Sequence, residues 1–166
     1  MHASFMPAVG LGQACSTLVG KYLGKKNLHA AKISMIESLR GSLIIMGTMG
    51  VIFILFPKYI ISLFTYQQEL IDSGYFILQF VGGVQIIDAI GITLWFGLNG
   101  AGDTFFPAVI LFLLQWIIIL PIGYLVGIYY KFGIIGPWLA MAIEITLFAI
   151  IISYRVQSGQ WKLKNV

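Results

Sequence analysis

The sequence carries very little charge. Only 10% of its 166 residues are Asp, Glu, Lys or Arg, whereas 59% are hydrophobic, and the mean hydropathy is +0.94. Because a soluble domain carries about 25% charged residues, this chain has too few of them to cover a surface that faces water. The sequence therefore predicts an integral membrane protein.

Cysteine and histidine are almost absent. Cys15 is the single cysteine, which excludes a disulfide framework, and His2 and His29 are the two histidines, so no cluster has metal-ligand spacing. The first twelve residues lack the basic residues that open a signal peptide. The net charge of +4 comes from basic residues at the ends of apolar runs, where they orient a membrane protein. We expect no nucleic-acid partner, no resident metal and no cofactor.

Long apolar runs occupy most of the chain. A helix needs about 20 mostly apolar residues to cross the roughly 30 Å hydrocarbon core, and its backbone must be hydrogen-bonded within the segment. We predict an all-α fold, a polytopic transmembrane bundle over residues 1–154 followed by a polar cytoplasmic tail at 155–166. The expected spans are about 3–23, 41–64, 73–98, 105–130 and 134–154.

The basic residues are distributed unequally between the two sides of this bundle. Only Lys58 and Lys131 fall on one side, and the other side receives Lys21, Lys25, Lys26, Lys32, Arg40, Arg155, Lys162 and Lys164. The positive-inside rule makes the basic side cytoplasmic, so the C-terminus is expected inside and the start of the chain outside. Five crossings that begin outside without an export signal suggest that at least one upstream helix is missing.

The turn "LNGAGDTFFP" at residues 98–107 joins two of the most apolar segments. Asn99 and Gly100 tolerate the left-handed conformation that ends a helix. Asp103 or Thr104 is expected to cap the next helix by accepting a free backbone N–H. These features predict a tight helical hairpin.

Three motifs in this order resemble the multidrug and toxic compound extrusion (MATE) transporters. "LNGAGDTFFPA" resembles the connector between the fourth and fifth helices of one lobe, and "GLGQACSTLVGKYLGKKNLHAA" at 10–31 is similar to a second-helix signature. "GIIGPWLAMAIEITLFAIIISYRVQSGQW" at 133–161 resembles the last helix. Lys21, Lys25 and Lys26 depart from the family pattern, where Gln or small residues are usual.

The resemblance implies an architecture and a function. The family has twelve helices in two six-helix lobes around a central cavity, and this chain resembles the second lobe without its first helix. It implies secondary active export of organic cations or drugs by antiport against Na⁺ or H⁺, in the plasma (inner) membrane of a prokaryote. The expected partners are the substrate, the coupling ion, the bilayer, and either an N-terminal lobe or a second copy.

Asp88 is the residue with the strongest functional signal. It precedes Leu98 by ten residues, or about 15 Å of helix, which places it near the bilayer midplane. A carboxylate at that depth should face the bundle interior or a wet cavity, where it either binds a proton or sodium ion or hydrogen-bonds a neighbouring helix. The NorM-like branch of the family has an aspartate at the same distance before its Gly-x-x-Asp-Thr turn, which implies a cation-coupling role. Gln85 shares the same helix face.

Other polar and aromatic residues are open to two interpretations each. Glu144, inside the fifth span, either joins an ion pathway or pairs with Gln115 or a hydroxyl as a structural bridge. Pro121 interrupts the fourth span beside a Gly-x-x-x-Gly pair and is a candidate hinge. Trp95 and Trp116 either line a cavity for flat organic cations through cation–π contacts or pack against neighbours.

Three alternatives to an exporter stay open. A lipid-linked oligosaccharide flippase of the same superfamily would want a strongly basic cavity, and no span interior contains Lys or Arg. A membrane-embedded enzyme would need an acid pair, a Ser/His pair or metal ligands in a recognisable motif, which is lacking here; we therefore expect no enzyme. The third alternative is an inactive, truncated fragment.

Overall fold

The computed structural model describes residues 2–133 and 135–163, which form helices joined by short turns, with no strand in those ranges. It confirms the predicted all-α bundle. The long helices are α1 (His2–Gly24), α2 (Leu28–Leu55), α4 (Gln68–Gly100) and α7 (Ile135–Gln157). The shorter elements are α3 (Pro57–Ser62), α5 (Phe105–Leu114), α6 (Leu120–Tyr124), the π-helical turns η1 (Gln115–Ile119) and η2 (Leu125–Tyr129), and the 3₁₀ turn η3 (Gln160–Leu163).

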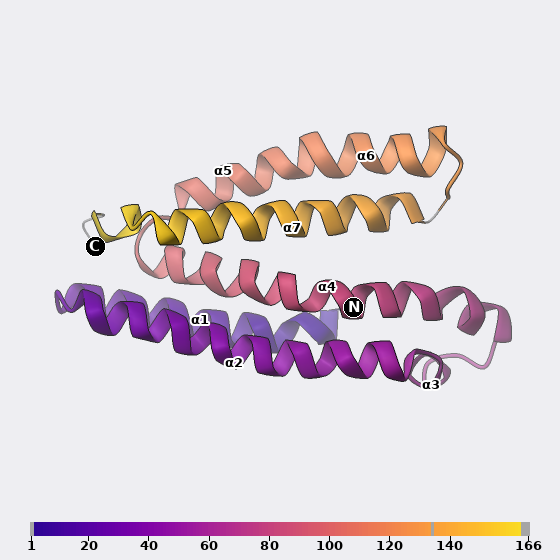
Figure 1. Ribbon diagram of the computed structural model, residues 1–166, viewed down its shortest axis with the longest axis horizontal. Coiled ribbons are helices and arrows are strands. Elements are labelled where there is room, and N and C mark those ends of the chain that lie inside the picture. Colours follow the sequence, from indigo (N-terminus) through magenta and orange to yellow (C-terminus); the bar gives the residue numbers. More distant parts are fainter. Residues whose placement is uncertain (1, 134, 164–166) are drawn as a thin grey trace.

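Helix α4 occupies the middle of the bundle (Figure 1). It contacts α1 and α2 on one side and α7 on the other, and α7 also packs against the rod formed by α5, η1, α6 and η2. The α1–α2 turn, the α4–α5 turn and the C-terminal end of α7 all lie at one end of the molecule, which we call the basic end. Helix α3 and the connection before α7 lie at the opposite end.

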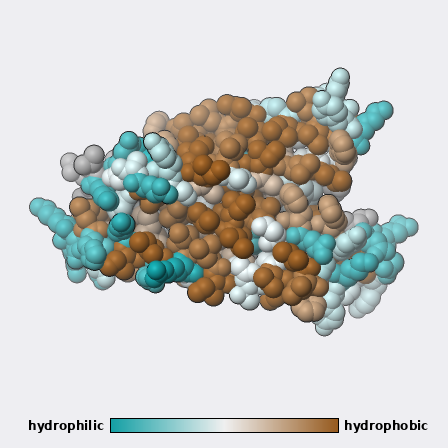
Figure 2. Space-filling model, viewed as in Figure 1, coloured by the Kyte–Doolittle hydropathy of each residue, from teal (hydrophilic) through white to brown (hydrophobic). Residues whose placement is uncertain are grey.

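A broad apolar band separates two polar ends on the face shown in Figure 2. Within the described residues, four helical segments are long and apolar enough to cross a membrane: Leu28–Leu55, Gln68–Gly100, Phe105–Tyr129 and Ile135–Gln157. Helix α1, which is rich in Gly, Ser and Thr, is not among these four. The chain is thus a multi-pass membrane protein, and α1 is the least apolar of its five long rods.

The second apolar segment differs from its predicted extent of 41–64. Helix α2 begins at Leu28, because the Asn27 side chain accepts a hydrogen bond of 3.0 Å from the Ala30 N–H and so starts the helix before the apolar run. It ends at Leu55, and Pro57 opens the separate helix α3 at a position where its missing N–H costs little. The predicted span is therefore divided between two helices.

Glycines allow α4 and η2 to approach their neighbours at backbone distance. A Cβ on Gly50 of α2 would lie 2.6 Å from the carbonyl oxygen of Gly82 on α4. A Cβ on Gly136 of α7 would overlap the backbone of Gly127 in η2, and one on Gly100 would overlap the backbone of Ser16 in α1. The atoms that an added Cβ would meet belong to the backbone, so no side-chain rotation can relieve the contact. These glycines therefore fix where the helices cross.

We predict that Gly100→Ala destabilises the bundle. The added methyl group meets the Ser16 backbone, so α1 and α4 must separate, at a cost of at least about 1–3 kcal/mol. Thermal unfolding in detergent measures the loss. Gly47→Ala in α2 is the matched control, because nothing lies within 4 Å of its added methyl group and alanine favours the helix. Equal melting temperatures for the two variants would contradict the close α1–α4 crossing.

Candidate functional site

Asp88 of α4 and Glu144 of α7 lie close enough to interact electrostatically, and Gln85 lies one turn from Asp88 on α4; we call these three residues the polar cluster. Gln85 and Asp88 lie three residues apart on α4, so they share one helix face. Asp88 precedes the end of α4 by twelve residues and Glu144 precedes the end of α7 by thirteen, about 18–20 Å of helix in each case. Because both helices end at the basic end, the two carboxyl groups lie at similar depth.

Gln85 and Glu144 are buried, Asp88 is half-buried, and the polar cluster is incompletely hydrogen-bonded. Gln85 is 1% exposed and Glu144 is 7% exposed. Among the described residues, the side-chain amide nitrogen and oxygen of Gln85 and Oδ2 of Asp88 have no hydrogen-bond partner. A buried polar group without a partner costs about 1–3 kcal/mol. These atoms are therefore candidates for binding a ligand.

The chemistry of the cluster suits a small cation. Asp88 and Glu144 are close enough to interact electrostatically, and two carboxylates in a medium of low dielectric constant repel each other unless a proton or cation lies near them. A cavity of about 10 Å³, near the size needed for one water molecule, is lined by Gln85, Asp88, Met141 and Ile145 among others. Carboxylate and amide oxygens are hard donors, which suit hard cations. Within the described ranges, no group of three or more His, Cys, Asp or Glu residues has the arrangement of a metal site.

The two candidate tryptophans lie away from this cavity. Trp95 packs edge-on against Phe148 of α7, with ring centroids 6.0 Å apart. Trp116 is 58% exposed on the outside of the bundle, beside Phe112. Neither ring lines the cavity beside Asp88.

Of two other glutamines in the apolar segments, Gln79 makes a hydrogen bond to a neighbouring helix, and Gln115 makes none to Glu144 among the described residues. In the part of the chain that the structure describes, no hydrogen bond joins Glu144 to Gln115, so that structural bridge is not formed. Gln79 has a structural role, because its Nε2 donates a hydrogen bond of 3.1 Å to the carbonyl oxygen of Ile54, near the end of α2.

Pro121 lies between two π-helical turns. It belongs to α6, with η1 immediately before that helix and η2 immediately after it. In η1 the hydrogen bond shifts by one residue, so that the Leu120 N–H donates to the carbonyl oxygen of Gln115. Proline and π-turns are both recognised causes of helix kinks, and π-turns occur frequently at functional sites. The hinge role of Pro121 stays a prediction.

The helix stop at the α4–α5 turn lies two residues later than predicted. Asn99 and Gly100 are helical, and Gly102 takes the left-handed conformation with φ of 77°. The Gly102 N–H donates to the Asn99 carbonyl and the Asp103 N–H donates to the Leu98 carbonyl, both at 3.0 Å. This pair of bonds is a Schellman motif. The expected role of Asn99 and Gly100 as the left-handed stop was wrong.

Thr104 does not have the capping role expected of it, and Asp103 forms a buried ion pair. Thr104 is the N-cap residue of α5, but its side chain makes no capping hydrogen bond. The fully buried Asp103 forms an ion pair of 2.8 Å with Nε of Arg155, which is only 17% exposed. The Arg155 guanidinium also lies 4.5 Å from the centre of the Phe106 ring. This Asp103–Arg155 clamp joins the α4–α5 turn to the end of α7.

A buried pair of hydroxyl groups joins α2 to α4. The Thr93 hydroxyl donates a hydrogen bond of 2.7 Å to the Ser42 hydroxyl, and both residues are buried. Sequence patterns do not reveal this pair, because single Ser and Thr residues in apolar helices are common and usually bond to their own backbone. The only available signal was their position within apolar segments.

Together these features define a polytopic helical membrane protein with an intramembrane acidic cluster. The family model MatE matches residues 2–125, so the chain belongs to the MatE family. Over 98% of its length it is 31% identical to the probable multidrug resistance protein NorM of Thermotoga maritima, and over 92% it is 28% identical to the multidrug resistance protein MdtK of Proteus mirabilis.

A solved structure shares the fold. It is described as an inward-facing conformation of a multidrug resistance MATE family transporter of the MOP superfamily, and it superposes with a TM-score of 0.82 over 99% of this chain at 18% identity. The chain spans 39% of that structure and about a third of the length of the NorM and MdtK relatives. The resemblance predicted from three motifs is thus confirmed.

We predict that Asp103→Ala strongly destabilises the protein. The substitution leaves the guanidinium of Arg155 in a mostly buried position without its described carboxylate partner, a change that costs about 3–5 kcal/mol. Unfolding by denaturant in detergent measures this free energy. Glu37→Ala is the control, because it breaks an ion pair with Arg40 whose side chains are both exposed, and it should change stability little. A stable Asp103→Ala protein would refute the clamp.

Proposed function

We propose that this chain is part of a secondary active transporter that exports organic cations or drug-like molecules in exchange for Na⁺ or H⁺. The observation that carries the proposal is the polar cluster, in which buried polar atoms of Gln85 and Asp88 lack partners among the described residues. The names of the relatives, multidrug resistance proteins NorM and MdtK, support the same class of function.

Asp88 is the coupling residue in this mechanism. When it is ionised, its charge and that of Glu144 repel each other, and binding of Na⁺ or a proton relieves the repulsion. Loading the cluster changes the local charge by one unit, which weakens attraction for an organic cation and favours its release. Unloading restores the negative charge and the affinity for the next substrate. The coupling ion and the substrate therefore exchange.

Glu144 and Gln85 assist Asp88 in this scheme. Glu144 contributes the second carboxylate from α7, and Gln85 supplies an amide oxygen from the same face of α4. Movement of α7 against α4 would separate the two acids and change their affinity for the ion. Alternating access of this kind is the usual consequence of rocking between helical units around a fixed site. Pro121 and its neighbouring π-turns are the proposed point of bending.

Part of the substrate pathway lies outside this chain in the proposal. The relatives are almost three times longer, so an N-terminal lobe or a second copy would supply the facing wall of a central cavity. The exposed ring of Trp116 is a candidate contact on that pathway. Trp95 is the weaker candidate, since it packs against Phe148.

The charge distribution favours an exporter over the two alternative activities. The cluster contains no Lys or Arg, whereas a pyrophosphate-linked lipid would require positive charge at the binding site. Among the described residues no group of three or more His, Cys, Asp or Glu could hold a metal ion, so metal-dependent enzymatic chemistry has no support. We propose the plasma membrane of a prokaryote as the location, with the basic end cytoplasmic.

We predict that Asp88→Asn in the intact transporter abolishes ion-driven efflux. Asparagine keeps the shape of the side chain but cannot release a proton or neutralise Na⁺. The efflux rate should therefore fall at least about tenfold, which is the change in equilibrium that corresponds to one pKa unit. The measurement is efflux of a fluorescent organic cation from vesicles under an imposed Na⁺ or H⁺ gradient. The gradient that drives wild-type efflux identifies the coupling ion.

Asp72→Asn is the matched control for this prediction. Asp72 is an exposed acid on the same helix, and it pairs with Lys58 at the opposite end of the bundle. Its substitution should leave efflux unchanged, and both variants should insert in the membrane at wild-type levels. Normal efflux by Asp88→Asn would remove Asp88 from the coupling mechanism.

We predict that residues at the two ends of the bundle are labelled from opposite sides of the membrane. Cys15 is buried, so a new cysteine is the accessible thiol. Gln160→Cys, near the C-terminus, should react with a membrane-impermeant maleimide only in inside-out vesicles. Tyr66→Cys, at a 99% exposed position in the connection before α4, should react in intact cells. Labelling of both variants from the same side would rule out the proposed topology.

A further inference from the structure

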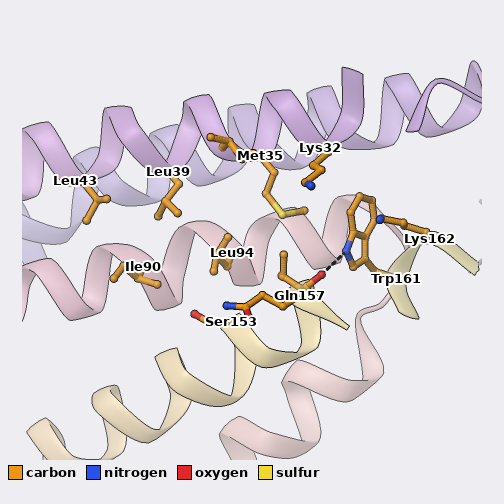
Figure 3. A pocket seen from close by; sticks show the side chains of 12 residues that line it. Lys32, Met35, Leu39, Leu43, Ile90, Leu94, Ser153, Gln157, Trp161 and Lys162 are labelled. Atoms are coloured by element: carbon orange, nitrogen blue, oxygen red, sulfur yellow. Dashed lines mark hydrogen bonds between the residues drawn. The ribbon is translucent and has the colours of Figure 1, made fainter. Parts of the chain in front are cut away.

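A groove separate from the polar cluster opens between α2 and α7 at the basic end (Figure 3). Its volume is about 440 Å³, within the roughly 300–1,000 Å³ range of ligand pockets. Ile90 and Leu94 of α4 form its floor, and Met35, Leu39 and Leu43 form the α2 wall. The body of the groove is therefore hydrocarbon.

The length of the groove matches one leaflet of a bilayer. Along α2 it extends from Lys32 to Leu43, eleven residues or about 16 Å of helix. The hydrocarbon core is roughly 30 Å thick. A groove that starts at the polar end of the bundle and runs this far ends near the bilayer midplane, which is the depth that one acyl chain reaches.

The mouth of the groove is basic. Lys32 on α2 and Lys162 on η3 are both exposed, and they lie at the same end of the groove in Figure 3. Among the described residues that line the groove there is no Asp or Glu, so none of these lining residues neutralises the two lysines. Ser153 and Gln157 add uncharged polar groups on the α7 side of the groove. The mouth is thus suited to a phosphate oxygen.

Trp161 connects the basic mouth to the apolar body. Its ring is buried in the groove wall, and its Nε1 donates a hydrogen bond of 3.0 Å to the Val156 carbonyl oxygen. Lys162 Nζ lies 5.7 Å from the centre of the same ring. Tryptophan is the residue that settles at the boundary between headgroups and hydrocarbon. The groove therefore has the polarity profile of a phospholipid, with a charged end, an interfacial ring and an apolar floor.

We propose that this groove binds an anionic phospholipid of the surrounding leaflet, with its phosphate between Lys32 and Lys162 and one acyl chain over Leu39, Leu43 and Ile90. Charge complementarity selects this occupant, because a neutral or zwitterionic lipid gains little from two unopposed lysines. The bound lipid would hold η3 against α2 and α4. This proposal goes beyond the proposed transport function and does not depend on it.

Native mass spectrometry of the full chain tests the proposal. The protein, in mild detergent, is titrated with phosphatidylglycerol and, separately, with phosphatidylcholine of identical acyl chains. We expect preferential binding of phosphatidylglycerol. The affinity should fall about 30-fold in Lys32→Ala/Lys162→Ala, because each lysine near an anionic headgroup strengthens binding roughly five-fold. Leu39→Trp, which fills the groove and leaves the charges in place, should also lower the occupancy.

The double variant Lys25→Ala/Lys26→Ala is the matched control. It removes the same charge from the α1–α2 turn, outside the groove, and should bind phosphatidylglycerol like the wild type. Circular dichroism and gel filtration verify that all variants are folded. Equal binding of the two lipids by the wild type, an equal loss in both double variants, or full occupancy in folded Leu39→Trp would each overturn the proposal. So would protection of the groove by a second protein copy in place of lipid.

Discussion

Hydrocarbon offers no hydrogen-bond partner, and every polar group that α4 carries into the membrane must be satisfied inside the bundle. Thr93 meets this constraint through Ser42, and Gln79 meets it through a backbone carbonyl near the end of α2. Gln85 and Asp88 do not, because some of their buried side-chain atoms lack partners among the described residues. This difference on one helix separates the polar groups that hold the bundle together from those available to a ligand.

The central position of α4 depends on how closely its neighbours can approach. Gly82 lets the backbone of α2 pack against it, and Gly100 does the same for α1. The position of α7 opposite them then brings Glu144 to the depth of Asp88. Because the two acids come from separate helices, a shift of α7 along α4 would change the repulsion between the carboxylates.

The basic end combines rigid connections with an open groove. The Schellman motif at Gly102 and the Asp103–Arg155 clamp attach the α4–α5 turn to the end of α7. Trp161 then folds back over the same region. The result is a fixed protein surface at the level of the headgroups, where a lipid and the helix ends can meet without disturbing the polar cluster deeper in the membrane.

The sequence by itself determined the helical membrane fold and the family, because apolar length and local motifs are properties of contiguous residues. The depth of Asp88 stays a prediction from helix rise. The sequence also indicated the acid at Glu144, but not which side chains would surround it. Only the tertiary structure decided that Asp103 pairs with Arg155, fifty-two positions away, and that Gly100 serves a helix crossing while Gly102 ends the helix. Those roles depend on which helix packs against each residue. Contacts between segments far apart in the chain produce no periodic pattern in the sequence.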